Sequence, residues 1–229
     1  MQSVIPNLYF FDFTFQSPKR VSPIQIDGNL DDWSELNIVP DLMHLKGAKP
    51  FAYVYFSWDD DSLYIGLSVT GKNKPVDVDN IRFWRKDCLE VWIDLRNDKT
   101  RRRYSEHCHQ FFFLPKGRKK NEEIATAGEC RQPGSSIQET IFDHEEIEVA
   151  SIVGQREYSL EARIPRSVIP TYNPIEHSVI WFNYHLNDVD KRAQWWSCGP
   201  DFPRHLDPST WGSAELIEVA EPVHTGGSE

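Results

Sequence analysis

The stretch of sequence that decides the fold is Trp84-Arg85-Lys86-Asp87-Cys88-Leu89-Glu90-Val91-Trp92-Ile93-Asp94. Side chains along a β-strand point alternately to its two faces, so a strand over residues 88–95 has two different surfaces. One surface is wholly aliphatic and suits the core of a β-sandwich: Leu89, Val91, Ile93 and Leu95. The other carries two carboxylates and an indole: Glu90, Asp94 and Trp92. An aromatic platform beside hydrogen-bond acceptors is what a site for a polyhydroxylated ligand requires.

Short strand-like segments recur along the whole chain. Residues 50–71 predict a hairpin, because two β-rich runs flank the turn at 59–62. Further strands are expected over 103–114, 137–142, 145–153, 157–164, 179–188 and 214–219, with a helical turn at 165–169 and a polar excursion at 115–136. About ten short strands predict an all-β fold, an antiparallel β-sandwich of the immunoglobulin or jelly-roll kind with one or two short helical turns. We expect one domain over residues 1–229, with its core at about 24–219.

Composition narrows the class of partner. The 229 residues include 8 Trp, 8 Tyr and 13 Phe, an aromatic content that favours strands and binding faces. A net charge of −10 argues against a nucleic-acid partner. No apolar run reaches the roughly 18 residues of a membrane span, so no membrane partner is expected. The N-terminus lacks a charged region followed by an apolar one, which predicts a cytoplasmic protein, or a secreted or periplasmic one if a leader was trimmed.

Metal and disulfide chemistry receive little support from the residues. The four cysteines, at positions 88, 108, 130 and 198, include no C-x-x-C pair, so neither a zinc site nor a disulfide framework is predicted. The acidic turn Asp27-Gly28-Asn29-Leu30-Asp31-Asp32 has the carboxylate density to hold a calcium ion. A hydrogen-bonded turn without an ion explains the same residues, and we favour it.

Six segments together resemble a known family. They are Ile26-Asp27-Gly28-Asn29-Leu30-Asp31-Asp32-Trp33, Trp58-Asp59-Asp60-Asp61-Ser62-Leu63-Tyr64-Ile65, Trp84-x-x-Asp87-x-x-Glu90-x-x-x-Asp94, Tyr158-Ser159-Leu160-Glu161-Ala162-Arg163-Ile164-Pro165, Phe182-Asn183 through Asp188, and Trp211-Gly212-x-x-x-Leu216. In this order they resemble the carbohydrate-binding module family 9 domains, relatives of the DOMON-like sandwiches.

The resemblance implies a non-catalytic module with a role in polysaccharide catabolism. In that family two tryptophans hold a sugar ring at the end of a glucan or xylan chain, so the expected partner is a mono- or oligosaccharide. The family's first platform and its glutamate correspond to Trp84 and Glu90, and the second platform to Trp195 or Trp196. The resemblance also implies structural calcium without locating it; no other cofactor is expected.

The remaining polar residues receive lesser roles. Asn187 and Arg163 lie on polar strand faces or ends, which makes them second-rank candidates for hydrogen bonds to sugar hydroxyls. Trp92 and Asp94, at mid-strand, are assigned to the scaffold.

Three other functions stay open from the sequence. Paired carboxylates such as Glu90 and Glu161 could serve a glycoside hydrolase. Some DOMON-like sandwiches bind haem through Met and His, and Met43 adjoins His44 here. A partner-binding sandwich that has lost its ligand is the third alternative.

Overall fold

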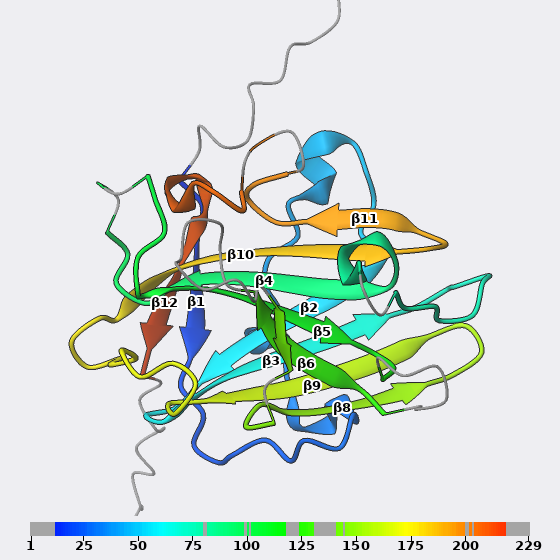
Figure 1. Cartoon of the computed structure of the whole chain (residues 1–229), viewed down its shortest axis with the longest axis horizontal. Helices are drawn as coiled ribbons and strands as arrows, with labels where there is room; N and C mark the ends of the chain where they lie inside the picture. Colours follow the sequence, from blue (N-terminus) through cyan, green and yellow to red (C-terminus); the bar gives the residue numbers. More distant parts are fainter. Residues whose placement is uncertain are drawn as a thin grey trace, which may run out of the picture.

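The computed structural model describes residues 12–79, 82–98, 100, 102–117, 124–130, 141–143, 145–199, 202 and 204–218. They form two β-sheets that lie against one another (Figure 1). The larger sheet has the order β1-β12-β10-β4-β5-β6-β7, with β11 also paired to β10. Its strands are β1 (Thr14–Pro18), β4 (Cys88–Asp94), β5 (Cys108–Leu114), β6 (Thr126–Cys130), β7 (Ile141–Asp143), β10 (Val179–Asp188), β11 (Arg192–Trp195) and β12 (Gly212–Ile217). The smaller sheet has the order β2-β3-β9-β8, from β2 (Ala52–Trp58), β3 (Ser62–Val69), β8 (Glu148–Val153) and β9 (Tyr158–Pro165).

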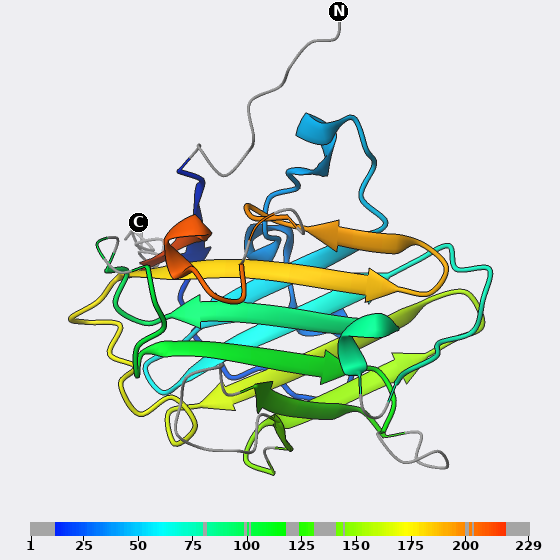
Figure 2. The ribbon, with the colours of Figure 1, turned by 45° about the horizontal axis from the view of Figure 1, so that its top comes forward.

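The core lies between the two sheets and confirms the expected alternation. Leu89, Val91 and Ile93 of β4 are fully buried in it. The small sheet contributes the matching alternate positions of β3 and β9, among them Leu63, Ile65, Leu67, Leu160 and Ile164. In Figure 2 the large sheet stands in front of the small one. The side chains of β4 that alternate with the core residues therefore belong to the face of the large sheet that is turned away from the small sheet.

Several elements differ from the expectation. The sandwich is not wholly antiparallel, because β1 pairs with β12 in parallel. The excursion predicted over 115–136 contains β6, which extends the large sheet beyond β5. The strand β5 begins at Cys108 instead of residue 103. In the segment 165–169, Pro165 ends β9 and residues 166–168 form a turn. The helical elements of the described residues are short 3-10 turns such as η5 (Phe83–Arg85). The part of the predicted strand 137–142 before Ile141 lies outside the described residues.

The acidic turn near the N-terminus is closed by its own hydrogen bonds. Asp27 Oδ1 accepts from the Asn29 amide at 2.8 Å, and Asp32 Oδ2 accepts from the Gln25 amide at 3.0 Å. The Asn29 side chain donates to Asp31 Oδ2 at 2.7 Å. Across the described ranges, no group of three or more His, Cys, Asp or Glu side chains is arranged to hold a metal ion. The residues of the acidic turn therefore do not fit the calcium ion that the resemblance implies.

Glu161 anchors this turn to the small sheet. Its buried carboxylate accepts from the Trp33 indole at 2.8 Å and from the amides of Gly28 and Asp27 at 2.8 and 3.2 Å. Burial raises the pKa of the Glu161 carboxyl, and the three donated hydrogen bonds oppose that rise. Glu161 is thus committed to holding the N-terminal segment.

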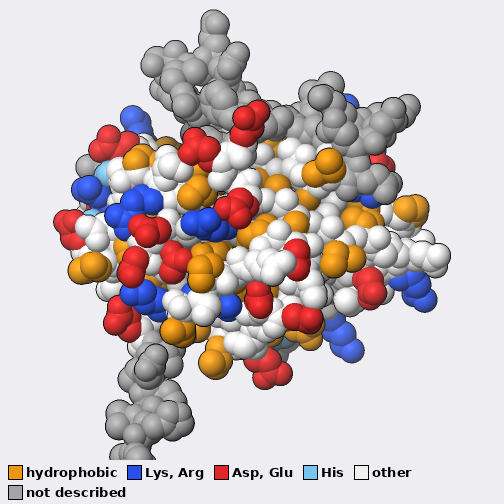
Figure 3. Space-filling view, turned by 90° about the horizontal axis from the view of Figure 1, so that it is seen from below, with side chains coloured by type: hydrophobic (Ala, Val, Ile, Leu, Met, Phe, Trp, Pro, Cys, Tyr) orange, Lys and Arg blue, Asp and Glu red, His pale blue; other side chains and the backbone are white. Residues whose placement is uncertain are grey.

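The face shown in Figure 3 intersperses acidic, basic and hydrophobic side chains. Within the part of the chain that the structure describes, no helix is long and apolar enough to cross a membrane.

Replacing Glu161 with alanine should destabilise the fold. Three donors would lose a charged acceptor, and a buried donor left without a partner costs about 1–3 kcal/mol. We expect the free energy of unfolding in urea to fall by about 3 kcal/mol or more. Glu218→Gln is the control, because it removes the charge of an exposed side chain that pairs with Lys19. It should change the free energy of unfolding by less than about 1 kcal/mol. A loss for Glu161→Ala as small as the control's would contradict the anchoring role.

Candidate functional site

The outward face of β4 is covered at both of its ends. Trp92 is 1% exposed and belongs to a cluster with Trp181, Cys198 and Trp211, against which Tyr104 and Phe202 pack. Asp94 is also buried and accepts from the Arg96 amide at 2.9 Å. At the other end, Cys88 lies beneath Phe83. Trp92 and Asp94 therefore belong to the scaffold, and Glu90 is the outward residue between the two covered stretches.

Glu90 is held by side chains from the strands on either side. It is 5% exposed, and its Oε1 accepts from Gln110 Nε2 of β5 at 2.9 Å. On β10 its direct register partner is His185, whose Nδ1 lies 3.7 Å from Glu90 Oε2. That distance exceeds a normal hydrogen bond, and Nδ1 has no other partner among the described residues. A fixed, nearly buried carboxylate results, of the kind that accepts hydroxyl hydrogen bonds well.

Trp84 stands on the same outer face, where the chain enters β4. Phe83 stacks on Phe112 of β5 with ring centroids 4.3 Å apart, which seats the turn of η5 on the sheet. Trp84 packs edge-on against Phe83, with centroids 5.1 Å apart, and the Asn187 side chain donates to its backbone carbonyl. Trp84 is 44% exposed as a residue, a high value for tryptophan. Asn187 thus acts on the backbone of Trp84, and the indole remains accessible.

The two adjacent tryptophans at the end of β11 have different environments. Trp196 is 1% exposed and packs in the core against Phe15 and Phe182, so it cannot offer a ring face to a ligand. Trp195 points to the outer face, is partly exposed and lies beside His185 with centroids 6.4 Å apart and planes inclined by 27°. The Lys46 ammonium lies 4.1 Å from the centre of the Trp195 ring. Of these two adjacent tryptophans, Trp195 is the one that shares a face with Glu90.

Arg163 and Glu161 lie on the small sheet. Arg163 Nε donates to Ser62 Oγ at 2.9 Å, and its Nη1 pairs with Glu148 at 2.8 Å. Both residues occupy the outer side of β9, since Leu160, Ala162 and Ile164 fill the core from the same strand. Glu90 occupies the outer side of the opposite sheet. The sandwich therefore separates Glu90 from Arg163 and from Glu161.

The Met43–His44 pair proposed for haem also has local partners. Met43 is buried at 6% exposure, and His44 Nδ1 lies 3.2 Å from Asp41 Oδ2 in the same segment.

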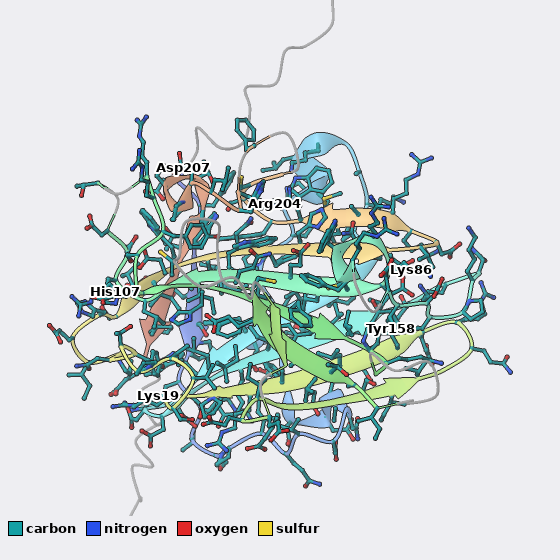
Figure 4. All side chains as sticks on the ribbon, in the orientation of Figure 1. Lys19, Lys86, His107, Tyr158, Arg204 and Asp207 are labelled. Atoms are coloured by element: carbon teal, nitrogen blue, oxygen red, sulfur yellow. The ribbon has the colours of Figure 1, made fainter. Side chains whose placement is uncertain are left out.

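The sequence analysis did not identify several polar side chains of this region. Gln110 and His185 reach Glu90 from neighbouring strands, and Lys46 reaches Trp195 from η4 (Met43–Lys46). The Arg204 guanidinium lies 5.4 Å from the Trp92 ring centre, in the segment between β11 and β12 (Figure 4). The available signal for His185 was the alternation on β10, which places it on the same face as Asn183 and Asn187. Gln110 shares its face of β5 with Cys108, Phe112 and Leu114, so alternation gave no such signal for it. The strand register that brings them to Glu90 is not visible in a single sequence.

The family follows from comparison with known sequences. The family described as "Carbohydrate family 9 binding domain-like" matches residues 26–219, most of the chain. The chain belongs to this family. The resemblance carried by the six sequence segments is thereby confirmed.

Curated relatives are much longer than this chain. An exoglucanase XynX from Acetivibrio thermocellus is 25% identical over 225 residues, covering 91% of this chain and 18% of the relative. An endo-1,4-beta-xylanase A from Thermotoga maritima is 28% identical over 202 residues, covering 84% and 17%. The chain thus spans less than a fifth of the length of either.

Solved structures share the fold. A family 9 carbohydrate binding module from Caldicellulosiruptor kristjanssonii in complex with cellotriose superimposes with a TM-score of 0.60 at 18% identity, covering 95% of this chain and all of that one. Its complex with glucose gives a TM-score of 0.61, covering 93% of this chain. These neighbours confirm the β-sandwich.

His185 should make stability depend on pH. Burial lowers the pKa of His185 below 6.5, and the nearby Arg204 lowers it further, although Glu90 opposes both. Between the folded and unfolded pKa values the unfolded chain binds a proton that the folded protein does not. The free energy of unfolding should therefore decrease as pH falls through 6.5 towards the lower folded pKa.

Urea unfolding between about pH 7.5 and 5 measures this slope. The slope for His185→Gln should be smaller than that for the wild type, because the variant lacks the imidazole. An unchanged slope in His185→Gln would show that His185 does not titrate as its burial requires.

Proposed function

We propose that this module binds a mono- or oligosaccharide of the glucan or xylan type without catalysing a reaction on it. A sugar ring stacks on Trp84, Glu90 accepts hydrogen bonds from its hydroxyl groups, and Trp195 borders the ring from the side of β11. The observation that carries the proposal is a tryptophan residue 44% exposed, anchored through Phe83 and Asn187 on the outer face that also holds Glu90.

The chemistry of the residues suits a sugar. The C–H faces of a pyranose are apolar and stack on an indole, whose two χ angles leave little side-chain entropy to lose. The Glu90 carboxylate, fixed by Gln110, supplies charged acceptors for hydroxyl groups. A single ring held in this way should bind with micromolar to millimolar affinity, about 4–8 kcal/mol.

The relatives support the same class of ligand. The family is named for carbohydrate binding, and the structural neighbours were solved with cellotriose and with glucose. The curated relatives are named as an exoglucanase and xylanases. We extend the glucan or xylan preference to this chain as part of the proposal, together with a role in polysaccharide catabolism.

The arrangement of carboxylates argues against a glycosidase. Glycosidases place two carboxyl groups roughly 5–10 Å apart across the scissile bond. Glu161 is committed to Trp33 and the turn before it, on the opposite side of the sandwich from Glu90. The pair considered from the sequence therefore cannot flank one glycosidic bond.

Trp84→Ala should abolish most of the affinity. An exposed tryptophan that anchors a ligand is worth about 2 kcal/mol or more, so the Kd for cellobiose should rise at least about thirtyfold. Isothermal titration calorimetry is the suitable measurement, because the substitution removes a fluorophore. Tyr53→Ala, which removes a 56% exposed aromatic from β2 of the other sheet, is the matched control and should bind like the wild type. Equal affinities for both variants, or a folded wild type with no hits on a glycan array, would refute the proposal.

Glu90→Gln tests the acceptor role separately. The amide keeps the shape of the side chain but removes its charge and one acceptor, so we expect a loss of about 1–2 kcal/mol in cellobiose affinity. The melting temperature reports whether the fold is retained. Glycoside turnover by the wild type that disappears in Glu90→Gln would instead establish an enzyme.

A further inference from the structure

A buried lysine lies between two buried aspartates next to the proposed site. Lys72 is 1% exposed, and its Nζ lies 2.5 Å from Asp188 Oδ2 and 3.1 Å from Asp87 Oδ2. Both carboxylate side chains are fully buried. The ammonium also lies 5.7 Å from the centre of the Tyr158 ring. Charges buried to this degree are stable only when paired and hydrogen-bonded, so the three groups form one unit, here called the Lys72 cluster (Lys72, Asp87 and Asp188).

The carboxylate oxygens of the Lys72 cluster are occupied by backbone donors. Asp87 accepts from the amides of Asp77 and Val189 at 2.9 and 2.8 Å. Asp188 accepts from the amides of Asp190 and Lys191, both at 2.8 Å. The Lys72 backbone is itself fixed, since its amide donates to the Arg156 carbonyl at 2.7 Å.

The Lys72 cluster joins the two segments that carry the proposed platforms. Asp87 follows Trp84 by three residues and begins the approach to β4. Asp188 ends β10, directly after Asn187, and the turn that it caps leads into β11 and Trp195. Figure 4 labels Tyr158, whose ring faces the Lys72 ammonium, and Lys86, which precedes Asp87 in the sequence. The spacing of the two segments therefore depends on the charges between them.

We propose that the Lys72 ammonium fills the position of a bound cation between Asp87 and Asp188, and that it positions the Trp84 and Trp195 segments without a divalent metal. The inference rests on the proposed function for its link to sugar binding. Calcium requires six to eight oxygen ligands, whereas here two carboxylates surround an ammonium and their remaining oxygens accept amide hydrogens. A covalently attached cation cannot be removed by a chelator. Lys72 is thus a positioning residue for the sugar platform.

The first test uses the wild-type protein. After treatment with EDTA, its melting temperature and its Kd for cellobiose should be the same with and without added calcium chloride. A rise in melting temperature on adding calcium, or a loss of cellobiose binding after EDTA, would overturn the inference. This arm needs no variant and remains decisive if a substitution at Lys72 prevents folding.

The second test removes the ammonium and restores it. Lys72→Ala should raise the Kd for cellobiose at least tenfold and shift the indole N–H resonance of Trp84 in the NMR spectrum. Propylammonium, which matches the deleted atoms, should reverse both changes, whereas 1-propanol, of the same shape without charge, should not. A variant that binds like the wild type, or one rescued by neither compound, would overturn the inference.

A matched substitution controls for general effects on this segment. Lys86→Ala removes a solvent-accessible lysine that pairs with Asp77 at 2.7 Å, and it should leave the Kd and the Trp84 resonance unchanged. If the wild type binds no sugar, the proposed function fails. The calcium arm and the Trp84 resonance then still decide the role of Lys72.

Discussion

Burial of both faces of β4 is the constraint on which the rest of the structure depends. A strand in a sandwich normally presents one face to the core and the other to solvent. Here the outward residues Trp92 and Asp94 are as buried as Leu89 and Val91 on the core side. The segments that follow β4 and β11 must therefore fold back over the large sheet. They leave Glu90 as the outward residue of β4 between the covered ends.

Two glutamates on the outer faces of the sandwich show how one residue type serves two purposes. Glu161 on β9 and Glu90 on β4 both occupy outward positions near the middle of a strand. Glu161 accepts three donors from the N-terminal segment, which covers it completely. Glu90 receives a hydrogen bond from Gln110, and His185 Nδ1 lies 3.7 Å from its other oxygen. The first carboxylate stabilises the fold, and the second has acceptor capacity for a ligand.

The sequence predicted the strands whose side chains alternate clearly, including β2, β3, β4, β9 and β10. It missed β6, because Thr-Ala-Gly-Glu-Cys has small residues and no apolar alternation, and its strand character comes from pairing with β5. It also missed the parallel pairing of β1 with β12, which joins the two ends of the chain and leaves no local pattern. Non-local pairing of this kind is set by the tertiary fold.

The same limit applies to the site. Trp84 and Glu90 were proposed together because the family resemblance places both within one continuous segment of the sequence. Trp195 and Trp196 could not be separated, since neighbouring strand residues point in opposite directions and only the pairing of Trp195 with His185 sets the phase. Arg163 was a candidate because it lies on a polar strand face, but each sheet has such a face. Choosing between the faces requires the strand order, which the sequence left open.

An exposed indole is useful for binding only if it does not have to be ordered when the ligand arrives. Ordering a mobile side chain costs about 0.5–1.5 kcal/mol, a large share of the affinity available from one sugar ring. In this protein Phe83 stacks on Phe112, and the Asn187 side chain donates to the Trp84 carbonyl. The Lys72 cluster links the segment before β4 to the end of β10. These contacts hold the backbone of Trp84 and the ring of its neighbour Phe83, while Trp84 itself stays 44% exposed. In the proposed sugar site, the buried charges would thus keep the platform segments ordered before any ligand binds.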